Sequence, residues 1–139
     1  MSGLPDAAGY SGTPLARKLG IVRDGQRVLV VGAPEGLRLG PLPSVDLHSR
    51  PGRSPYDVIV AFCPDRRALD RRFVPLTARL ARAGGLWVAW PKRSSGLTTD
   101  LDENTVRDVG LAVGLVDNKV CAIDATWSGL RFVVRLRDR

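Results

Sequence analysis

The stretch RVLVVGAPEG, Arg27–Gly36, decides the fold. After its first arginine, the run up to Val31 is apolar without polar alternation, which is typical of a strand buried on both faces of a parallel sheet. Gly32 follows this run directly, and a glycine turn at such a point is where nucleotide-binding folds hold a cofactor. The stretch therefore predicts an α/β fold and raises the question of whether its turn binds a ligand.

Two more apolar runs, Tyr56–Cys63 and Leu86–Trp90, predict buried strands. Apolar residues recur at helical spacing over 65–80, which predicts a helix packed on a sheet. Pro75 removes one backbone hydrogen bond of that helix, so we expect a kink or two short helices there. The pair at positions 84 and 85, both glycine, is expected to end the helix and lead into the next strand.

Shorter elements are expected at four further places. A helix is predicted between an N-cap at Thr13 and a stop at Gly20, and a second one over Asp102–Val113. Pro34–Leu39 has room for one or two helical turns, and Ser44–Leu47 for a short strand.

The last part of the chain changes character. Over 130–137, apolar residues alternate with arginines and one valine, so one face of a strand is expected to be buried and the other largely wet. With the apolar run before the turn TWSG, this pattern predicts an antiparallel hairpin.

Strands that alternate with helices predict a Rossmann-like three-layer sandwich with a mostly parallel sheet and a C-terminal antiparallel hairpin. The chain has 139 residues, the length of one domain. We expect an N-terminal tail over 1–12 and a single Rossmann-like domain over 13–139.

Composition limits the class of protein. The net charge is +7, and no apolar run approaches the roughly 20 residues of a membrane span. The opening residues lack the pattern of a secretory signal, so we expect a cytoplasmic protein without a membrane partner. Cys63 and Cys121 lie far apart and only one histidine accompanies them, so no metal site is predicted.

Ligands of open α/β sheets bind beyond the carboxyl ends of the strands. Three loops leave such ends here, and they supply the candidate ligand-binding residues Gly32, Ala33, Glu35, Gly36, Cys63, Trp90, Lys92, Arg93, Ser94 and Ser95. The first loop lacks the middle glycine of a phosphate fingerprint and carries a carboxylate, which argues against a pyrophosphate. The third, WPKRSSG, combines two cations with hydroxyls, as an anion site does. Each loop is also compatible with an ordinary exposed turn.

The segment DRRALDRRF gathers four arginines, which are candidates for nucleic-acid phosphates: Arg66, Arg67, Arg71 and Arg72. Asp65 and Asp70 offset part of this charge, so a solvated helix face is the alternative. No arrangement typical of nucleophilic or paired-carboxylate catalysis is found, and no catalytic residue is assigned.

Several pieces of the chain resemble a family of small bacterial proteins filed as domain of unknown function thirty fifty-two. These pieces are AGYSGTPLARKLGI, VVGAPEG, VIVAF, GGLWVAWPKRSSG and LVDNKVCAIDATWSGLRFVVR. The resemblance spans nearly the whole chain and implies a stand-alone domain, and the family has no established activity.

A broader resemblance covers only part of the chain. LTARLARAGGLWVAWPK is similar to the segment around the fifth strand of class I S-adenosylmethionine-dependent methyltransferases. It implies a reduced methyltransferase-like topology with S-adenosylmethionine as the cofactor. The acidic residue such enzymes carry after their second strand corresponds to Asp46 or its neighbourhood, and Cys63–Asp65 does not match their catalytic loop.

The sequence thus leads to one main hypothesis and two alternatives. The main one is a small non-catalytic domain that binds a protein partner or a small anionic ligand, with no cofactor. The alternatives are a methyltransferase that uses S-adenosylmethionine with an altered glycine loop, and a basic nucleic-acid accessory protein.

Overall fold

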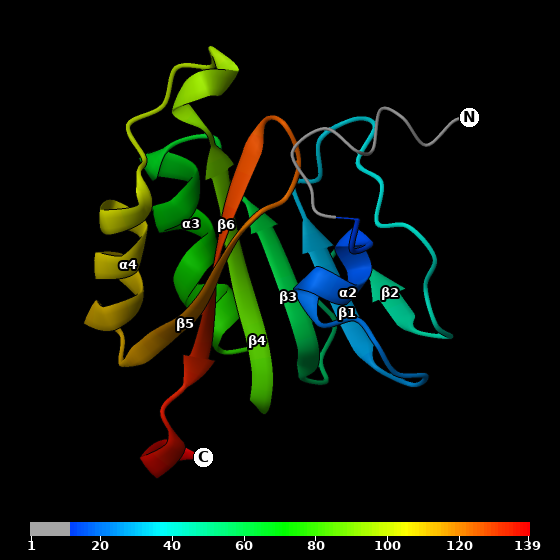
Figure 1. Ribbon diagram of the computed structural model, residues 1–139. Coiled ribbons are helices and arrows are strands. Elements are labelled where there is room, and N and C mark those ends of the chain that lie inside the picture. Colours follow the sequence, from blue (N-terminus) through cyan, green and yellow to red (C-terminus); the bar gives the residue numbers. More distant parts are fainter. Residues whose placement is uncertain (1–11) are drawn as a thin grey trace.

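The computed structural model describes residues 12–139 (Figure 1). The tail expected over 1–12 lies outside this range except for Gly12. The elements, in chain order, are α2 (Leu15–Leu19), β1 (Arg27–Val31), β2 (Asp46–His48), β3 (Tyr56–Phe62), α3 (Arg66–Thr77), β4 (Leu80–Pro91), the 3-10 turn η1 (Arg93–Ser95), α4 (Glu103–Ala112), β5 (Leu115–Ala122), β6 (Trp127–Val134) and the 3-10 turn η2 (Leu136–Asp138).

The six strands form one sheet in the order β2-β1-β3-β4-β6-β5. The pairs β1–β2, β1–β3 and β3–β4 are parallel, whereas β6 is antiparallel to both β4 and β5. The hairpin expected at the C-terminus is β5–β6, and β6 lies between β4 and the edge strand β5. The four residues between β5 and β6 are too few for a parallel crossover, which needs a dozen or more, so the two strands must be antiparallel.

The expected mostly parallel Rossmann-like sandwich is wrong. The sheet is mixed, and strand residues outnumber helical ones. The chain between β1 and β2 also contains no helix, although Pro34–Leu39 was a candidate. Proline at 34, 41 and 43 removes backbone donors, and Gly36 and Gly40 adopt positive φ, so this segment runs as a loop.

Within residues 12–139, the helices cover the two faces of the sheet unequally (Figure 1). On one face α3 and α4 pack through Leu69, Phe73 and Val106 against Ile59, Leu86 and Phe132 of the sheet, all of them buried. On the other face a smaller cluster joins Leu19 and Ala16 of α2 to Val60 and Trp87. We call these the two-helix face and the α2 face.

The pair Gly84–Gly85 does not end a helix, because β4 already begins at Leu80. A Cβ atom at Gly84 would lie 2.7 Å from the Asp57 carbonyl oxygen, and one at Gly85 would overlap the Arg131 guanidinium. These glycines therefore permit close contacts inside the strand, which is a use of glycine that a turn signal does not distinguish. Helix α3 also continues through Pro75 and ends two residues later.

Candidate ligand-binding site

The turn after β1 does not form an open cofactor site. Gly32 adopts φ +71°, and a Cβ atom there would lie 2.5 Å from Nη1 of Arg72. The Arg72 guanidinium donates a hydrogen bond to the Phe62 carbonyl at the end of β3. The space between the ends of β1 and β3 at Gly32 is therefore filled by the protein's own α3 side chain.

Cys63 lies beside this arginine and is fully buried. Burial raises the pKa of the Cys63 thiol to about 11, although the neighbouring Arg72 guanidinium acts in the opposite direction. The thiol is therefore protonated at neutral pH and is a poor nucleophile.

The other predicted ligand residues do not gather in one place. Ala33 and Glu35 are exposed in the first loop. In the third loop Trp90 is buried in the core, Arg93 and Ser94 are exposed, and the Ser95 hydroxyl donates to the Lys92 carbonyl at 2.6 Å. Trp90 and Arg93 line a pocket of about 390 Å³ together with residues 97–102, and that pocket includes no residue of the first loop.

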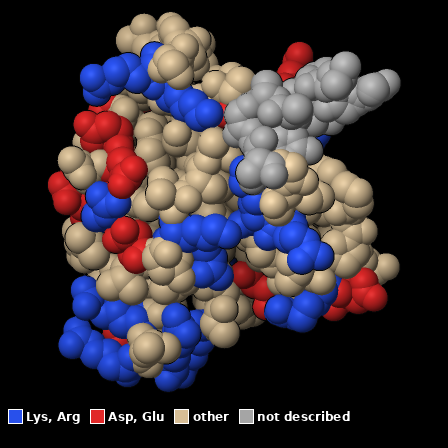
Figure 2. Space-filling view, viewed as in Figure 1, with Lys and Arg blue, Asp and Glu red and all other residues tan. Residues whose placement is uncertain are grey.

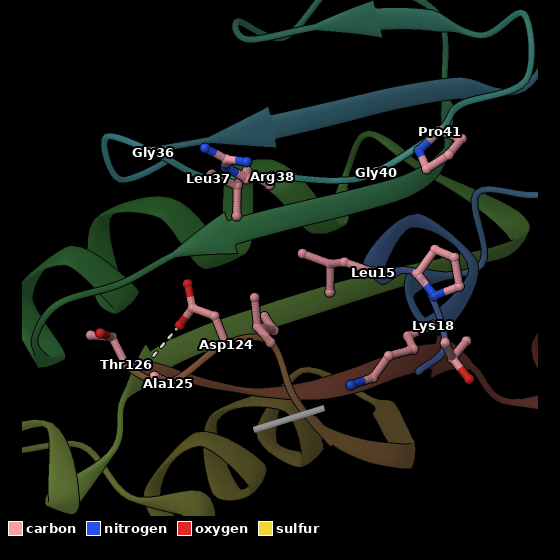
Figure 3. A pocket seen from close by; sticks show the side chains of 13 residues that line it. Leu15, Lys18, Gly36, Leu37, Arg38, Gly40, Pro41, Asp124, Ala125 and Thr126 are labelled. Carbon is pink, nitrogen blue, oxygen red and sulfur yellow. Dashed lines mark hydrogen bonds between the residues drawn. The ribbon is translucent and has the colours of Figure 1, made fainter. Parts of the chain in front are cut away.

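A larger cavity of about 410 Å³ lies on the α2 face (Figure 3). Three segments far apart in the sequence form its walls: the start of α2, the loop after β1 and the turn between β5 and β6. Its lining consists of Thr13, Pro14, Leu15, Lys18, Gly36, Leu37, Arg38, Gly40, Pro41, Ile123, Asp124, Ala125 and Thr126. Of the residues predicted from the sequence, it includes only Gly36.

Hydrogen bonds hold the three walls together. The Ala16 amide donates to the Leu39 carbonyl at 2.8 Å, which ties α2 to the loop after β1. Nζ of Lys18 donates to the Ala122 carbonyl at 2.9 Å, which ties α2 to the end of β5. Oδ1 of Asp124 accepts from the amides of Thr126 and Trp127, each at 2.8 Å, and so shapes the turn. The cavity is therefore bounded by backbone that is fixed on three sides.

The cavity combines an apolar lining with positive charge. Leu15, Leu37 and Ile123 contribute apolar surface, while Lys18 and Arg38 contribute cations. Within the described part of the chain, Arg38 makes no ion pair. In Figure 3 the Asp124 carboxylate extends from the turn toward the segment that carries Leu37 and Arg38. This arrangement suits a small molecule with an apolar part and an anionic group.

Sequence reasoning missed this cavity because its walls do not belong to the carboxyl edge of neighbouring strands. One local signal was present: Asp124 followed two residues later by Thr126 is typical of an Asx turn, which fixes a loop in one shape.

The four arginines of α3 do not act as one surface. Arg66 is paired with Asp70 at 2.8 Å, and its amide donates to the Asp100 carboxylate. Arg72 points inward to Phe62, while Arg67 and Arg71 remain exposed.

A hydrogen-bonded chain that sequence reasoning missed joins β2 to the start of β3. The Tyr56 hydroxyl and Nδ1 of His48 are 2.7 Å apart, and Nε2 of His48 lies 2.8 Å from Asp46. The buried hydroxyl also accepts from the Gly52 amide at 2.7 Å. The chain therefore fastens the loop before β3, and the alternation of Asp46 and His48 on one strand face was the signal for it.

Within residues 12–139, no three His, Cys, Asp or Glu side chains group so that they could bind a metal ion. None of the helices in this range is long and apolar enough to cross a membrane. No family model matches the chain, and neither does any curated protein. The two resemblances noted from the sequence therefore stay predictions.

Proposed function

We propose that the protein is a small non-catalytic domain that binds a small anionic ligand in the cavity between α2, the loop after β1 and the β5–β6 turn. The observation that carries this proposal is the cationic Arg38, without an ion pair in the described range, at a partly apolar cavity of about 410 Å³. A volume in this range fits a ligand of about the size of a nucleoside.

The lining supports binding rather than catalysis. Among the described residues of the lining, the one carboxylate belongs to Asp124, and one of its oxygens already holds the turn. The described lining contains no histidine or cysteine that could act as a base or nucleophile. In the cytoplasm, where we expect the protein to act, both cysteines stay reduced.

The methyltransferase alternative receives no support from the turn after β1, because Arg72 fills the space beside Gly32. The proposal therefore assigns S-adenosylmethionine no role.

Thermal denaturation with three anion and neutral pairs tests the proposal: adenosine monophosphate with adenosine, glucose 6-phosphate with glucose, and phenyl phosphate with phenol. A ligand that binds only the folded state stabilises it by mass action. We expect at least one anion to raise the Tm at 10 mM while its neutral partner leaves it unchanged. Absence of any shift with all three anions contradicts the proposal.

The variant Arg38→Gln tests the site itself. Arg50→Gln is the matched control, because Arg50 is exposed in the loop after β2 and makes no ion pair within residues 12–139. We expect Arg38→Gln to weaken binding of the active anion about tenfold, which corresponds to one charge-assisted hydrogen bond, and Arg50→Gln to leave it unchanged. Equal effects of both variants overturn the assignment of the cavity.

A further inference from the structure

Positive charge gathers on the α2 face of the β5–β6 hairpin. Lys119 of β5 and Arg131 of β6 are register partners, so their side chains share a face of the sheet. Arg131 is also the register partner of Trp87, which packs against α2. Both cations therefore lie on the α2 face, on neighbouring strands.

Among residues 12–139, helix α2 borders this part of the face, where Nζ of Lys119 donates to the Lys18 carbonyl at 3.4 Å, while α4 contacts β5 and β6 from the opposite side (Figure 1). Lys119 is exposed and Arg131 is half-buried. Figure 2, in the same view, shows blue side chains in the middle and lower left of this face, with most of the red ones along its margins.

Two further cations extend the group along β6. At one end Nε of Arg139 donates to the Val134 carbonyl at 2.9 Å. At the other end the Lys92 amide donates to the Thr126 carbonyl at 2.7 Å, and the Lys92 charge acts on the Cys121 thiol, which packs on the α2 face. The eight residues of β6 between these points span roughly 25 Å, at about 3.3 Å per residue. We call Lys92, Lys119, Arg131 and Arg139 the basic track.

The basic track lacks counter-charges. None of its four members makes an ion pair with a residue in 12–139, and the partner of Arg131 is the neutral amide oxygen of Asn118, at 3.3 Å. Burial and the charge of Arg139 lower the pKa of Arg131, which means that this guanidinium lies in a site that disfavours a lone cation. An anion along the track relieves that repulsion.

We infer that the basic track binds the phosphate backbone of a nucleic acid. A row of cations along β6, a strand of roughly 25 Å, matches a polyanion better than a single small ion, because several phosphates face it at once. The aromatic side chains of β6, Trp127 and Phe132, are buried, so bases cannot stack on them. We therefore expect binding to depend on the phosphates rather than on the base sequence of the nucleic acid.

The inference does not depend on the proposed function. The four track residues are absent from the lining of the α2-face cavity. The two sites adjoin at Lys18, which lines the cavity and whose carbonyl accepts from Nζ of Lys119 at 3.4 Å. Variants that leave Lys18 and Arg38 unchanged therefore test the track separately.

The experiment measures binding of the full chain to a fluorescent 20-base-pair DNA by anisotropy at 50 to 200 mM KCl. Neutralising four phosphates predicts a slope of log K against log salt of about −3.6, or a loss of roughly 100-fold in affinity over this range. Removal of two exposed charges in Lys119→Gln with Arg139→Gln is expected to bring the slope to about −1.8.

The matched control is Arg50→Gln with Arg53→Gln in the loop after β2, which removes the same net charge from exposed positions. We expect this pair to keep the wild-type slope. An equal loss in both pairs means that only net charge matters, and this overturns the inference. Undetectable binding at 50 mM KCl, or tighter binding to vesicles of phosphatidylglycerol than to DNA, also overturns it. If the full chain does not bind DNA but still binds a small anion, the inference fails while the proposed function stands.

Discussion

The two faces of the sheet solve the same problem of covering apolar strands in different ways. The two-helix face is covered by α3 and α4, and two of its arginines are paired with carboxylates: Arg66 with Asp70, and Arg107 with both Glu103 and Asp117. The α2 face has a five-residue helix and a loop, which leave a cavity and the basic track. The two faces therefore differ in how their helices cover the strands, and the cavity of about 410 Å³ lies on the α2 face.

The largest effect is expected from Phe73→Ala on the two-helix face. Phe73 is buried and meets Phe132 edge to face, with ring centroids 5.5 Å apart. Removing the ring leaves a cavity between α3 and β6, which costs about 3–5 kcal/mol of unfolding free energy in urea titrations. Val74→Ala is the control, because Val74 is 58% exposed and its truncation changes stability by about 0.5 kcal/mol at most. A loss under about 1 kcal/mol for Phe73→Ala means that this face is not the stabilising one.

The second effect concerns Cys63 and alkaline pH. Because burial raises the pKa of this thiol from 9.0 to about 11, the unfolded chain ionises first as the pH rises. The stability that the protonated thiol contributes is present below pH 9 and is lost as the pH rises to about 11, by roughly 2–3 kcal/mol. In urea titrations, the unfolding free energy of Cys63→Ala should fall less between pH 9 and about pH 11 than that of the wild type.

Thiol labelling compares the two faces directly at neutral pH. Cys121 on the α2 face is half-buried, and although burial raises the pKa of its thiol, the charges of Lys18, Lys119 and Lys92 act in the opposite direction. Iodoacetamide should therefore modify Cys121 before Cys63. The reverse order contradicts the closed character of the two-helix face.

Much of the fold could be predicted because local signals were strong. The strands at 27–31 and 56–62 and the helix over 66–77 follow from apolar runs and helical spacing. The N-cap of α3 is Asp65 and the C-cap of α2 is Gly20, and both are residue types that such positions prefer.

The sheet class could not be predicted in the same way, because it depends on where the C-terminal hairpin joins the sheet. Strand β6 lies between β4 and β5 and is antiparallel to both, and no local pattern in the sequence indicates that position. The cavity escaped prediction for a related reason: Lys18, Arg38 and Asp124 converge only through tertiary contacts of three distant segments. The position of the Arg72 side chain beside Gly32 could not be predicted either, because nothing in the sequence distinguishes Arg72 from the three other arginines of that segment.

The third effect separates two tryptophans of β4 that lie on opposite faces. On the α2 face, Nε1 of Trp87 donates to the Leu19 carbonyl at 3.0 Å, and both groups are buried. Trp87→Phe leaves that carbonyl without its donor, so we expect it to cost about 2 kcal/mol more than Trp90→Phe, for which the described residues provide no such bond. Because Trp87 holds α2, its replacement should also weaken anion binding in the cavity. Equal stability losses in chemical denaturation, with unchanged anion affinity, show that this bond does not hold α2 in place.

The smallest effect tests whether the two faces are independent. Asp65 caps α3 by accepting a hydrogen bond from the Ala68 amide at 2.9 Å, and Asp65→Ala is expected to cost about 1 kcal/mol of unfolding free energy. Asp108→Ala removes an equal charge from an exposed site in α4 that caps nothing, so it controls for the change in net charge. Since α3 lies on the two-helix face, we expect Asp65→Ala to bind the small anion with unchanged affinity. We also expect the Asp65→Ala and Asp108→Ala variants to bind DNA with equal affinity. A cap variant that weakens either interaction beyond this control shows that the two faces are coupled through the sheet, because Asp65 itself contacts neither site.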